Sequence, residues 1–166
     1  MAAQTEAAPK VPMKAIVAVV IGNWLEFYDF IVFSFFAVMI SRAFFPAELI
    51  GDPFIALLAV LATFWAGFLT RPIGAVIIGA YADRAGRKAA LTLTIMLMAV
   101  GTAVVALTPG YNTIGIAAPI LLVVGRLIQG FSCGGEVGPA TSYLLESAQP
   151  HQRAALTSWQ GTSQQF

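Results

Sequence analysis

Long apolar runs separated by short polar stretches dominate this sequence. Four runs cover residues 15–40, 54–81, 89–108 and 115–145, and a fifth begins near Ala154. A helix of about 20 residues is long enough to cross the hydrocarbon layer of a bilayer. Because lipid offers no partner to backbone N–H and C=O groups, we expect each run to be a helix. The pattern predicts an all-α membrane protein with four transmembrane helices and the start of a fifth.

The composition argues against several other classes of protein. The 166 residues are 58% hydrophobic and 10% charged, with a net charge of +1 and a single cysteine, Cys133. Soluble domains carry about a quarter charged residues, so this chain has too few to cover a water-exposed surface. The sequence has no basic stripe for a nucleic acid, and no GxSxG, HExxH or P-loop pattern. We therefore expect no enzyme, no metal and no nucleic acid, and interpret Cys133 as a small apolar residue.

Positive charges lie unequally on the two sides of the predicted spans. Lys10 and Lys14 precede the first run, the bases of 84–88 follow the second, and Arg153 follows the fourth. The opposite side carries only Arg42. The positive-inside rule then places the N-terminus in the cytoplasm. We expect a multi-pass protein of the inner cell membrane.

The turn between the second and third runs concentrates charge in an otherwise apolar chain. Its sequence, GAYADRAGRK, holds two glycines, one acid and three bases: Gly79, Asp83, Arg84, Gly86, Arg87 and Lys88. We expect Gly79 to allow a neighbouring helix to approach closely, and Gly86 to allow a tight reversal into the third run. A short cytoplasmic loop collects bases in any case, but that does not explain the order of the residues.

Charged and polar side chains inside the apolar runs are the candidate functional residues. Glu26 and Asp29 lie three residues apart and share one face of the first helix. Arg71 lies within the second run. Four residues of the fourth run form a stripe within about 80° of arc: Arg126, Gln129, Cys133 and Glu136. Ionised groups at membrane depth are costly unless paired or hydrated, so they mark a substrate or ion pathway, or else buried pairs that hold the bundle together.

Glycines repeat at four-residue spacing in the fourth run. Gly130, Gly134 and Gly138 form GxxxGxxxG beside the polar stripe. Small residues at this spacing let two helix backbones come into contact, and Gly67 and Gly74 are expected to act in the same way on the second helix. We therefore predict helix packing, not chemistry, at these five positions.

The charged turn resembles the loop between helices two and three of the major facilitator superfamily. There the loop acts as a cytoplasmic latch between the two halves of a transporter. Glu146 and Arg153, in ESAQPHQR, are similar to the E-x6-R pattern at the cytoplasmic end of helix four in that superfamily. The resemblance implies a cytoplasmic gate in which Glu146 pairs with Arg84 or Arg87. The alternative is an ordinary surface pair contributing at most about 1 kcal/mol.

Three further strings narrow the resemblance: GNWLEFYDF, TRPIGA and GRLIQGFSCGGE. They are similar to the metabolite:proton symporter family, and TPGYNTIGIAAP with TSWQGTSQQ is most like its citrate-proton symporter and tricarballylate transporter branch. The resemblance covers the chain from about residue 14. Such transporters have about twelve helices in two halves. The resemblance therefore implies an incomplete N-terminal transmembrane domain at 14–166, in a fragment whose partner is the missing C-terminal half. Residues 1–13 are Ala-rich and polar, and we expect them to form a disordered cytoplasmic tail.

The resemblance also implies roles for the charges within the spans. The protein would be a symporter of a small organic anion, citrate or a related tricarboxylate, with the proton as coupling ion and no other cofactor, working by alternating access. Asp29 is the first candidate for proton coupling, followed by Glu26 and Glu136. Guanidinium groups match carboxylates, and amides add hydrogen bonds. The candidate substrate-binding residues are Arg126, Gln129, Arg71, Gln160 and Gln164.

Two alternatives stay open from the sequence. The substrate of such a symporter could instead be a dicarboxylate, an aromatic acid, or an osmolyte such as proline or betaine. The chain could also be a truncated membrane subunit that associates through its glycine-rich helix and transports nothing.

Overall fold

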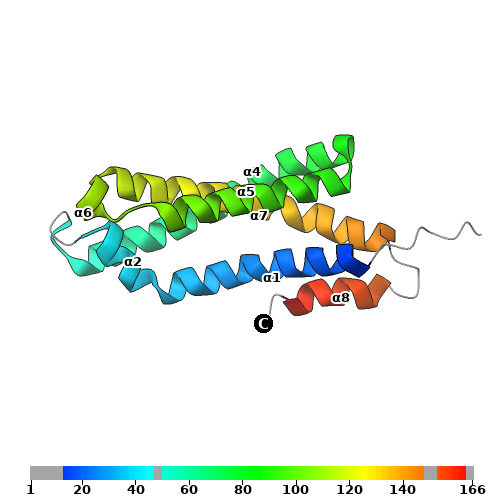
Figure 1. The fold of residues 1–166 in the computed structure, drawn as a ribbon, viewed down its shortest axis with the longest axis horizontal. Helices are drawn as coiled ribbons and strands as arrows, with labels where there is room; N and C mark the ends of the chain where they lie inside the picture. Colours follow the sequence, from blue (N-terminus) through cyan, green and yellow to red (C-terminus); the bar gives the residue numbers. More distant parts are fainter. Residues whose placement is uncertain (1–12, 47–49, 148–152, 164–166) are drawn as a thin grey trace, which may run out of the picture.

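A computed structural model of the chain describes residues 13–46, 50–147 and 153–163. Within these ranges every regular element is a helix, as the apolar runs predicted, and the helices form an elongated bundle (Figure 1). The helices are α1 (Met13–Phe35), α2 (Ala37–Phe44), α4 (Pro53–Ala85), α5 (Arg87–Leu107), α6 (Tyr111–Ile114), α7 (Ala117–Ser147) and α8 (Arg153–Ser163). The predicted tail, residues 1–13, lies outside the described residues except for Met13.

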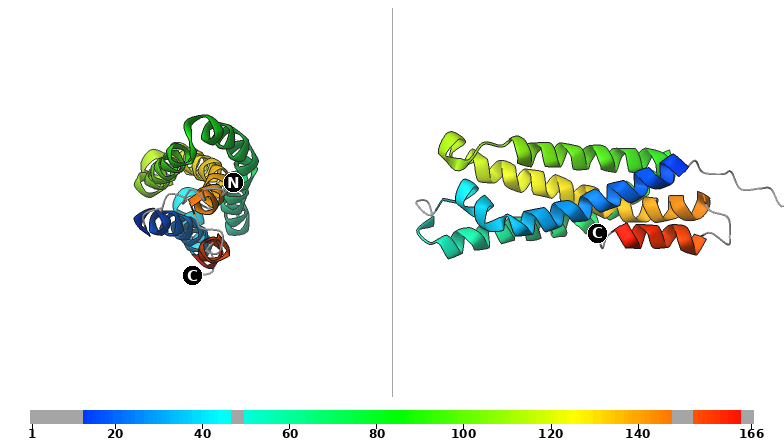
Figure 2. Two further views of the ribbon diagram at one scale, coloured as in Figure 1. Left: turned by 90° about the vertical axis from the view of Figure 1, so that its right-hand side faces the viewer. Right: turned by 60° about the horizontal axis from the view of Figure 1, so that its bottom comes forward.

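Helix α7 occupies the middle of the bundle. It packs most extensively against α4 and α5, whereas α8 lies beside both α1 and α7. The end-on view in Figure 2 shows α7 between the α4–α5 pair and the α1–α8 pair. The backbones of α1 and α7 approach each other at few places. Long side chains therefore make most of the contact between these two helices.

The first predicted span, 15–40, is not a single helix, which corrects that expectation. Helix α1 ends at Phe35, α2 begins at Ala37, and their axes are bent by 68°. The bend carries Ala37 toward α4 and α7, where it packs in an apolar cluster with Phe33, Val60 and Leu122. No proline or glycine marks the bend in FIVFSFFAVMI, so the apolar pattern alone could not predict it.

The second helix is longer than the predicted 54–81, and the charged turn is correspondingly shorter. Asp52 caps α4 by accepting a hydrogen bond from the Phe54 N–H at 2.8 Å. At the other end, α4 continues through Asp83 and Arg84, and only Gly86 separates it from α5. Gly86 has φ +94°, a conformation that L side chains rarely adopt. The reversal between the two helices therefore depends on this glycine.

Helices α4, α5 and α7 are each long and apolar enough to cross a membrane, and the bent α1–α2 pair would be a fourth span if it acts as one. Large apolar side chains point outward from these helices, among them Trp65, Leu69 and Val76 on α4. Such a surface suits lipid rather than water.

Glycines bring α4 and α7 into backbone contact. A methyl group at Gly130 or Gly134 would overlap the backbone carbonyl of Gly67 or Arg71, and one at Gly74 would overlap that of Phe131. The Thr70 hydroxyl adds a hydrogen bond to the Leu127 carbonyl at 3.1 Å. The two helix axes are thereby held close together over about two turns.

Two other glycines do not make the contacts expected of them. No described atom lies within 4 Å of the position that a Cβ would take at Gly79 or Gly138. The reason lies at Ile78, whose side chain fills the space facing Gly135, so the two backbones no longer touch there. Close packing through the GxxxGxxxG pattern thus involves Gly130 and Gly134 only.

These contacts predict different effects for the same glycine-to-alanine change at two positions of α7. Gly134→Ala should lower the free energy of unfolding by about 1–3 kcal/mol, because the new methyl group overlaps the α4 backbone. Gly138→Ala should leave it unchanged or raise it slightly, because alanine is a better helix former than glycine. Thermal unfolding of both variants in detergent would test this. Equal melting temperatures would show that the α4–α7 contact tolerates the extra volume.

Candidate functional site

The polar stripe of α7 faces the interior of the bundle, toward α1. Arg126, Gln129, Cys133 and Glu136 are all at most 5% exposed, although three of them are charged or strongly polar. From the opposite side α1 contributes Glu26, which is also buried, and Asp29, which is partly buried. Because the surrounding surface is apolar, this interface gathers the buried charges of the described chain.

An ion pair between α1 and α7 lies at the centre of this interface. The Arg126 Nη1 donates to Asp29 Oδ2 at 2.5 Å, and the two side chains are 5% and 20% exposed. The Gln129 amide donates to the Thr102 hydroxyl of α5 at 2.9 Å and lies 3.4 Å from the other Asp29 oxygen. The guanidinium of Arg126 also lies 3.7 Å from the centre of the Phe33 ring. The structure thus pairs the first proton-coupling candidate with the first substrate-binding candidate.

Arg71 of α4 is held differently, by aromatic rings. Its guanidinium lies 4.5 Å from the ring centre of Phe30 and 4.1 Å from that of Phe68. Its Nε and Nη2 are buried and have no hydrogen-bond partner among the described residues. Aromatic faces stabilise a cation without using its N–H donors, so these donors are available to an anion.

Further buried polar atoms in the same region lack a partner within the described chain. They are Glu26 Oε2, Arg126 Nε and Gln129 Oε1. Nearly all buried polar atoms in proteins are hydrogen-bonded, so such a group of exceptions requires an explanation. Both donors and acceptors are represented, which suits a small polar ligand or water molecules between α1, α4 and α7.

The other candidate residues lie apart from this interface or outside the description. Arg87 and Asp83 form an exposed ion pair at 2.8 Å across the Gly86 reversal between α4 and α5, and Arg84 and Lys88 are exposed beside it. Arg153 is exposed at the start of α8. The side chains of Glu146, Gln160 and Gln164 lie outside the described residues. The pairing of Glu146 with Arg84 or Arg87 therefore stays a prediction.

The sequence analysis missed several neighbours of the site. Asn23 of α1 is buried and donates to the Ser163 hydroxyl of α8 at 2.7 Å. It lies three residues before Glu26, so the helical spacing alone could have placed it on the same face. Thr102 and Phe68 come from helices whose position relative to α7 no periodicity reveals. Their contacts with Gln129 and Arg71 could be found only from the structure.

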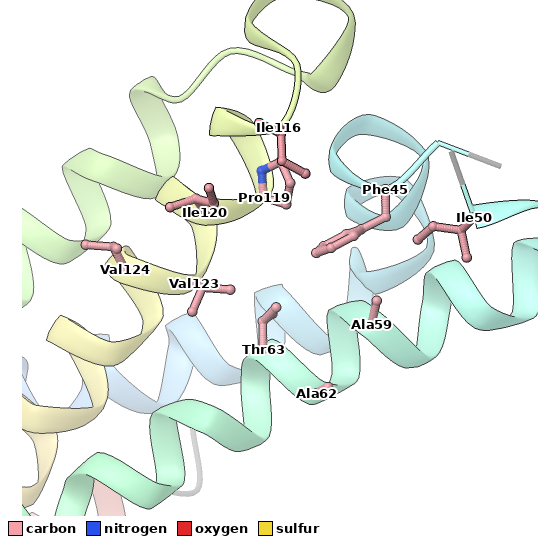
Figure 3. Close-up of a pocket in the computed structure, with 10 residues that line it drawn as sticks. All are labelled: Phe45, Ile50, Ala59, Ala62, Thr63, Ile116, Pro119, Ile120, Val123 and Val124. Carbon is pink, nitrogen blue, oxygen red and sulfur yellow. The ribbon is translucent and has the colours of Figure 1, made fainter. Parts of the chain in front are cut away.

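A cavity of about 550 Å³ lies away from these charges, between α2, α4 and the start of α7 (Figure 3). Its walls are apolar side chains such as Phe45, Ile116 and Val123, and it contains no charged residue. The Thr63 hydroxyl in its wall already donates to the Val60 carbonyl at 2.7 Å. This cavity is therefore unsuited to an anionic ligand.

Residues 14–166 match the family model described as "Sugar (and other) transporter". The chain therefore belongs to this transporter family, and the expected resemblance to the major facilitator superfamily is confirmed. No solved structure gives a significant match.

Among the relatives is the citrate-proton symporter of Salmonella typhi, 50% identical over 91% of this chain and 34% of its own length. The citrate-proton symporter of Klebsiella pneumoniae is 48% identical over 91% of this chain and 33% of its own. The glycine betaine/proline/ectoine/pipecolic acid transporter OusA of Dickeya dadantii (strain 3937) is 42% identical over 88% of this chain and 28% of its own. The chain thus spans about a third of the length of these relatives. Their names describe transporters, not enzymes.

The Asp29–Arg126 pair predicts strong coupling between two substitutions. Asp29→Asn or Arg126→Gln alone should lower stability, by up to about 3–5 kcal/mol for a fully buried pair and by less here because Asp29 is partly exposed. The double variant should be more stable than the sum of the two single effects implies, because neither charge is then left alone. Thermal unfolding of the four proteins in detergent measures this interaction.

The exposed Asp83–Arg87 pair provides the matched control. Asp83→Asn and Arg87→Gln should interact by no more than about 1 kcal/mol, because solvent screens their charges. Equal interaction energies for the two pairs would mean that burial does not strengthen the Asp29–Arg126 contact.

Proposed function

We propose that this chain is part of a proton-coupled secondary transporter for a small organic anion, citrate or a related tricarboxylate. The observation that carries the proposal is the contact between Asp29 and Arg126 inside an apolar bundle. A carboxylate that can accept a proton there neutralises a guanidinium that can bind a carboxylate substrate. The names of two relatives, both citrate-proton symporters, support the same reading.

The pair suggests how proton and substrate are linked. Protonation of Asp29 removes the negative charge that holds Arg126, and an unpaired buried guanidinium is unfavourable. A substrate carboxylate can then take the place of Asp29 on Arg126. Proton and anion would thus bind together, and the complex would be neutral enough to cross as the two halves of the transporter rock.

Arg71 favours a substrate with more than one carboxylate. Its unpartnered N–H groups lie on a different helix from Arg126, so the two guanidinium groups can bind two acidic groups of one molecule. A zwitterionic osmolyte is the second candidate, because a betaine carries a single carboxylate, which Arg126 alone could bind. The name of the Dickeya relative supports this alternative.

The orientation and the gate complete the proposal. The charges of the α4–α5 turn and Arg153 would lie in the cytoplasm, as would the N-terminus. Asp83 and Arg87 already pair there, and exposed pairs of this kind are weak enough to break and re-form. The charged turn would therefore hold the two halves together in one state and release them in the other.

The coupling role predicts that Asp29→Asn separates transport from the proton. In proteoliposomes containing the protein at its full encoded length, the variant should lose citrate accumulation driven by an inward proton gradient. It should retain exchange of labelled for unlabelled citrate, because exchange requires no net proton movement. Asp52→Asn, the same change at an exposed helix cap where asparagine also serves, should retain both activities. Full proton-driven uptake by Asp29→Asn would contradict the coupling role.

The substrate role predicts a loss of affinity in Arg126→Lys. Lysine keeps the charge but not the planar fork of donors, so the KM for citrate should rise tenfold or more, equivalent to about 1.4 kcal/mol. Arg42→Lys, the same change at an exposed position, should have no effect. Competition with unlabelled di- and tricarboxylates, betaine and proline would identify the substrate class. An unchanged KM, or competition by betaine alone, would reject the tricarboxylate.

A further inference from the structure

A second acidic group lies in the α1–α7 interface, beside the Asp29–Arg126 pair but not part of it. Glu26 is 3% exposed, and the Cys133 thiol of α7 lies beside its carboxyl group as a potential hydrogen-bond donor. The charge of Arg71 also acts on it, whereas its Oε2 is buried without a hydrogen-bond partner among the described residues. Burial and the charge of Asp29 disfavour an ionised Glu26, whereas Cys133 and Arg71 favour it.

Glu136 of α7 reaches toward the same place. It is 5% exposed, and its charge interacts with that of Glu26. Its Oε1 lies against α1, only 3.3 Å from the position that a Cβ would take at Gly22, one turn before Glu26. The absence of a side chain at Gly22 therefore leaves room for the second carboxyl group.

The charges around the two glutamates do not balance. The facing groups are Glu26 and Asp29 on α1, Arg71 on α4, and Cys133 and Glu136 on α7. Arg126 is engaged with Asp29, which leaves Arg71 as the cation that acts on Glu26. Two buried carboxyl groups that repel each other, with one cation acting on only one of them, do not both stay ionised, so one of them retains a proton.

The surroundings decide which glutamate is protonated. The Cys133 thiol and the positive charge of Arg71 both favour an ionised Glu26. The charged group that acts on Glu136 is Glu26, whose negative charge favours a protonated Glu136. We propose that Glu26 and Glu136 form a second proton-binding site, separate from Asp29, in which Glu136 holds the proton and Glu26 is ionised. A bound proton requires only these two neighbouring groups, whereas a cation such as Na⁺ requires several more oxygen ligands. The use of this proton rests on the proposed transport function, but its presence does not.

Infrared spectroscopy tests the site without any transport assay. The purified protein, at its full encoded length and in lipid at neutral pH without sodium, should show the C=O stretch of a protonated carboxyl group. Labelling with ¹³C-glutamate should shift this band, and labelling with ¹³C-aspartate should not. Glu136→Gln should abolish the band, whereas Asp52→Asn, a carboxyl-to-amide change outside the bundle core, should leave it unchanged.

Several results would overturn the second site. A wild-type protein without the band, a band that shifts only with labelled aspartate, or a band that survives in Glu136→Gln would each exclude a proton on Glu136. Loss of the band on adding NaCl, but not choline chloride, would show that a metal cation occupies the site instead. If Glu136→Gln does not fold, Glu136→Asp provides a second test, because it keeps a carboxyl group. In this variant the C=O band should shift with ¹³C-aspartate and no longer with ¹³C-glutamate. Failure of citrate transport with the band intact would reject the transport function alone.

Discussion

The cost of burying charge in an apolar bundle controls the arrangement of the interior. Arg126 cannot lie between helices that face lipid unless a partner neutralises it, and Asp29 supplies that partner from a helix almost 100 residues earlier in the chain. The pair therefore determines the rotation of α1 about its axis. Once Asp29 faces α7, Glu26 and Phe33 must face inward as well, because they lie on the same side of the helix.

Two kinds of packing divide the bundle. Helices α4 and α7 touch through glycines and backbone carbonyls, and α5 is tied to α7 by the Ser132 hydroxyl, which donates to the Thr94 carbonyl at 2.5 Å. Helix α1, by contrast, meets α7 through side chains: the Asp29–Arg126 ion pair in the middle, and an apolar cluster of Val19 with Ala140 and Leu144 near one end. Close packing of small residues resists sliding, whereas ion pairs and hydrogen bonds can exchange partners. Under the proposed function, the interface that rearranges is therefore the one between α1 and α7, where ligand and proton would bind.

The sequence predicted the helices well because lipid leaves few alternatives to them. Apolar runs located α4, α5 and α7 within a few residues, and helical spacing identified the buried stripe from Arg126 to Glu136. It could not predict the bend at Phe36, since the bend results from packing of α2 on distant residues. It could not identify pairs either, because spacing tells which residues share a face but not which face of another helix they meet. The same limit explains Gly138, which shares the spacing of Gly134 but not its contact.

The contacts between α1 and α7 also place the acids in an order. Moving back along α1 from Asp29 to Glu26 and Gly22, the partners on α7 advance from Arg126 to Cys133 and Glu136. The two helices thus run in opposite directions, as Figure 1 shows. The polar contacts continue along them toward the end of the bundle where α1 begins. Along α7 the distance from Arg126 to Glu136 is about 15 Å, half the thickness of a bilayer core. If that end faces the cytoplasm, a proton leaving Asp29 has acidic groups along its way in this direction, and Glu136 is the last buried one that the structure describes on α7.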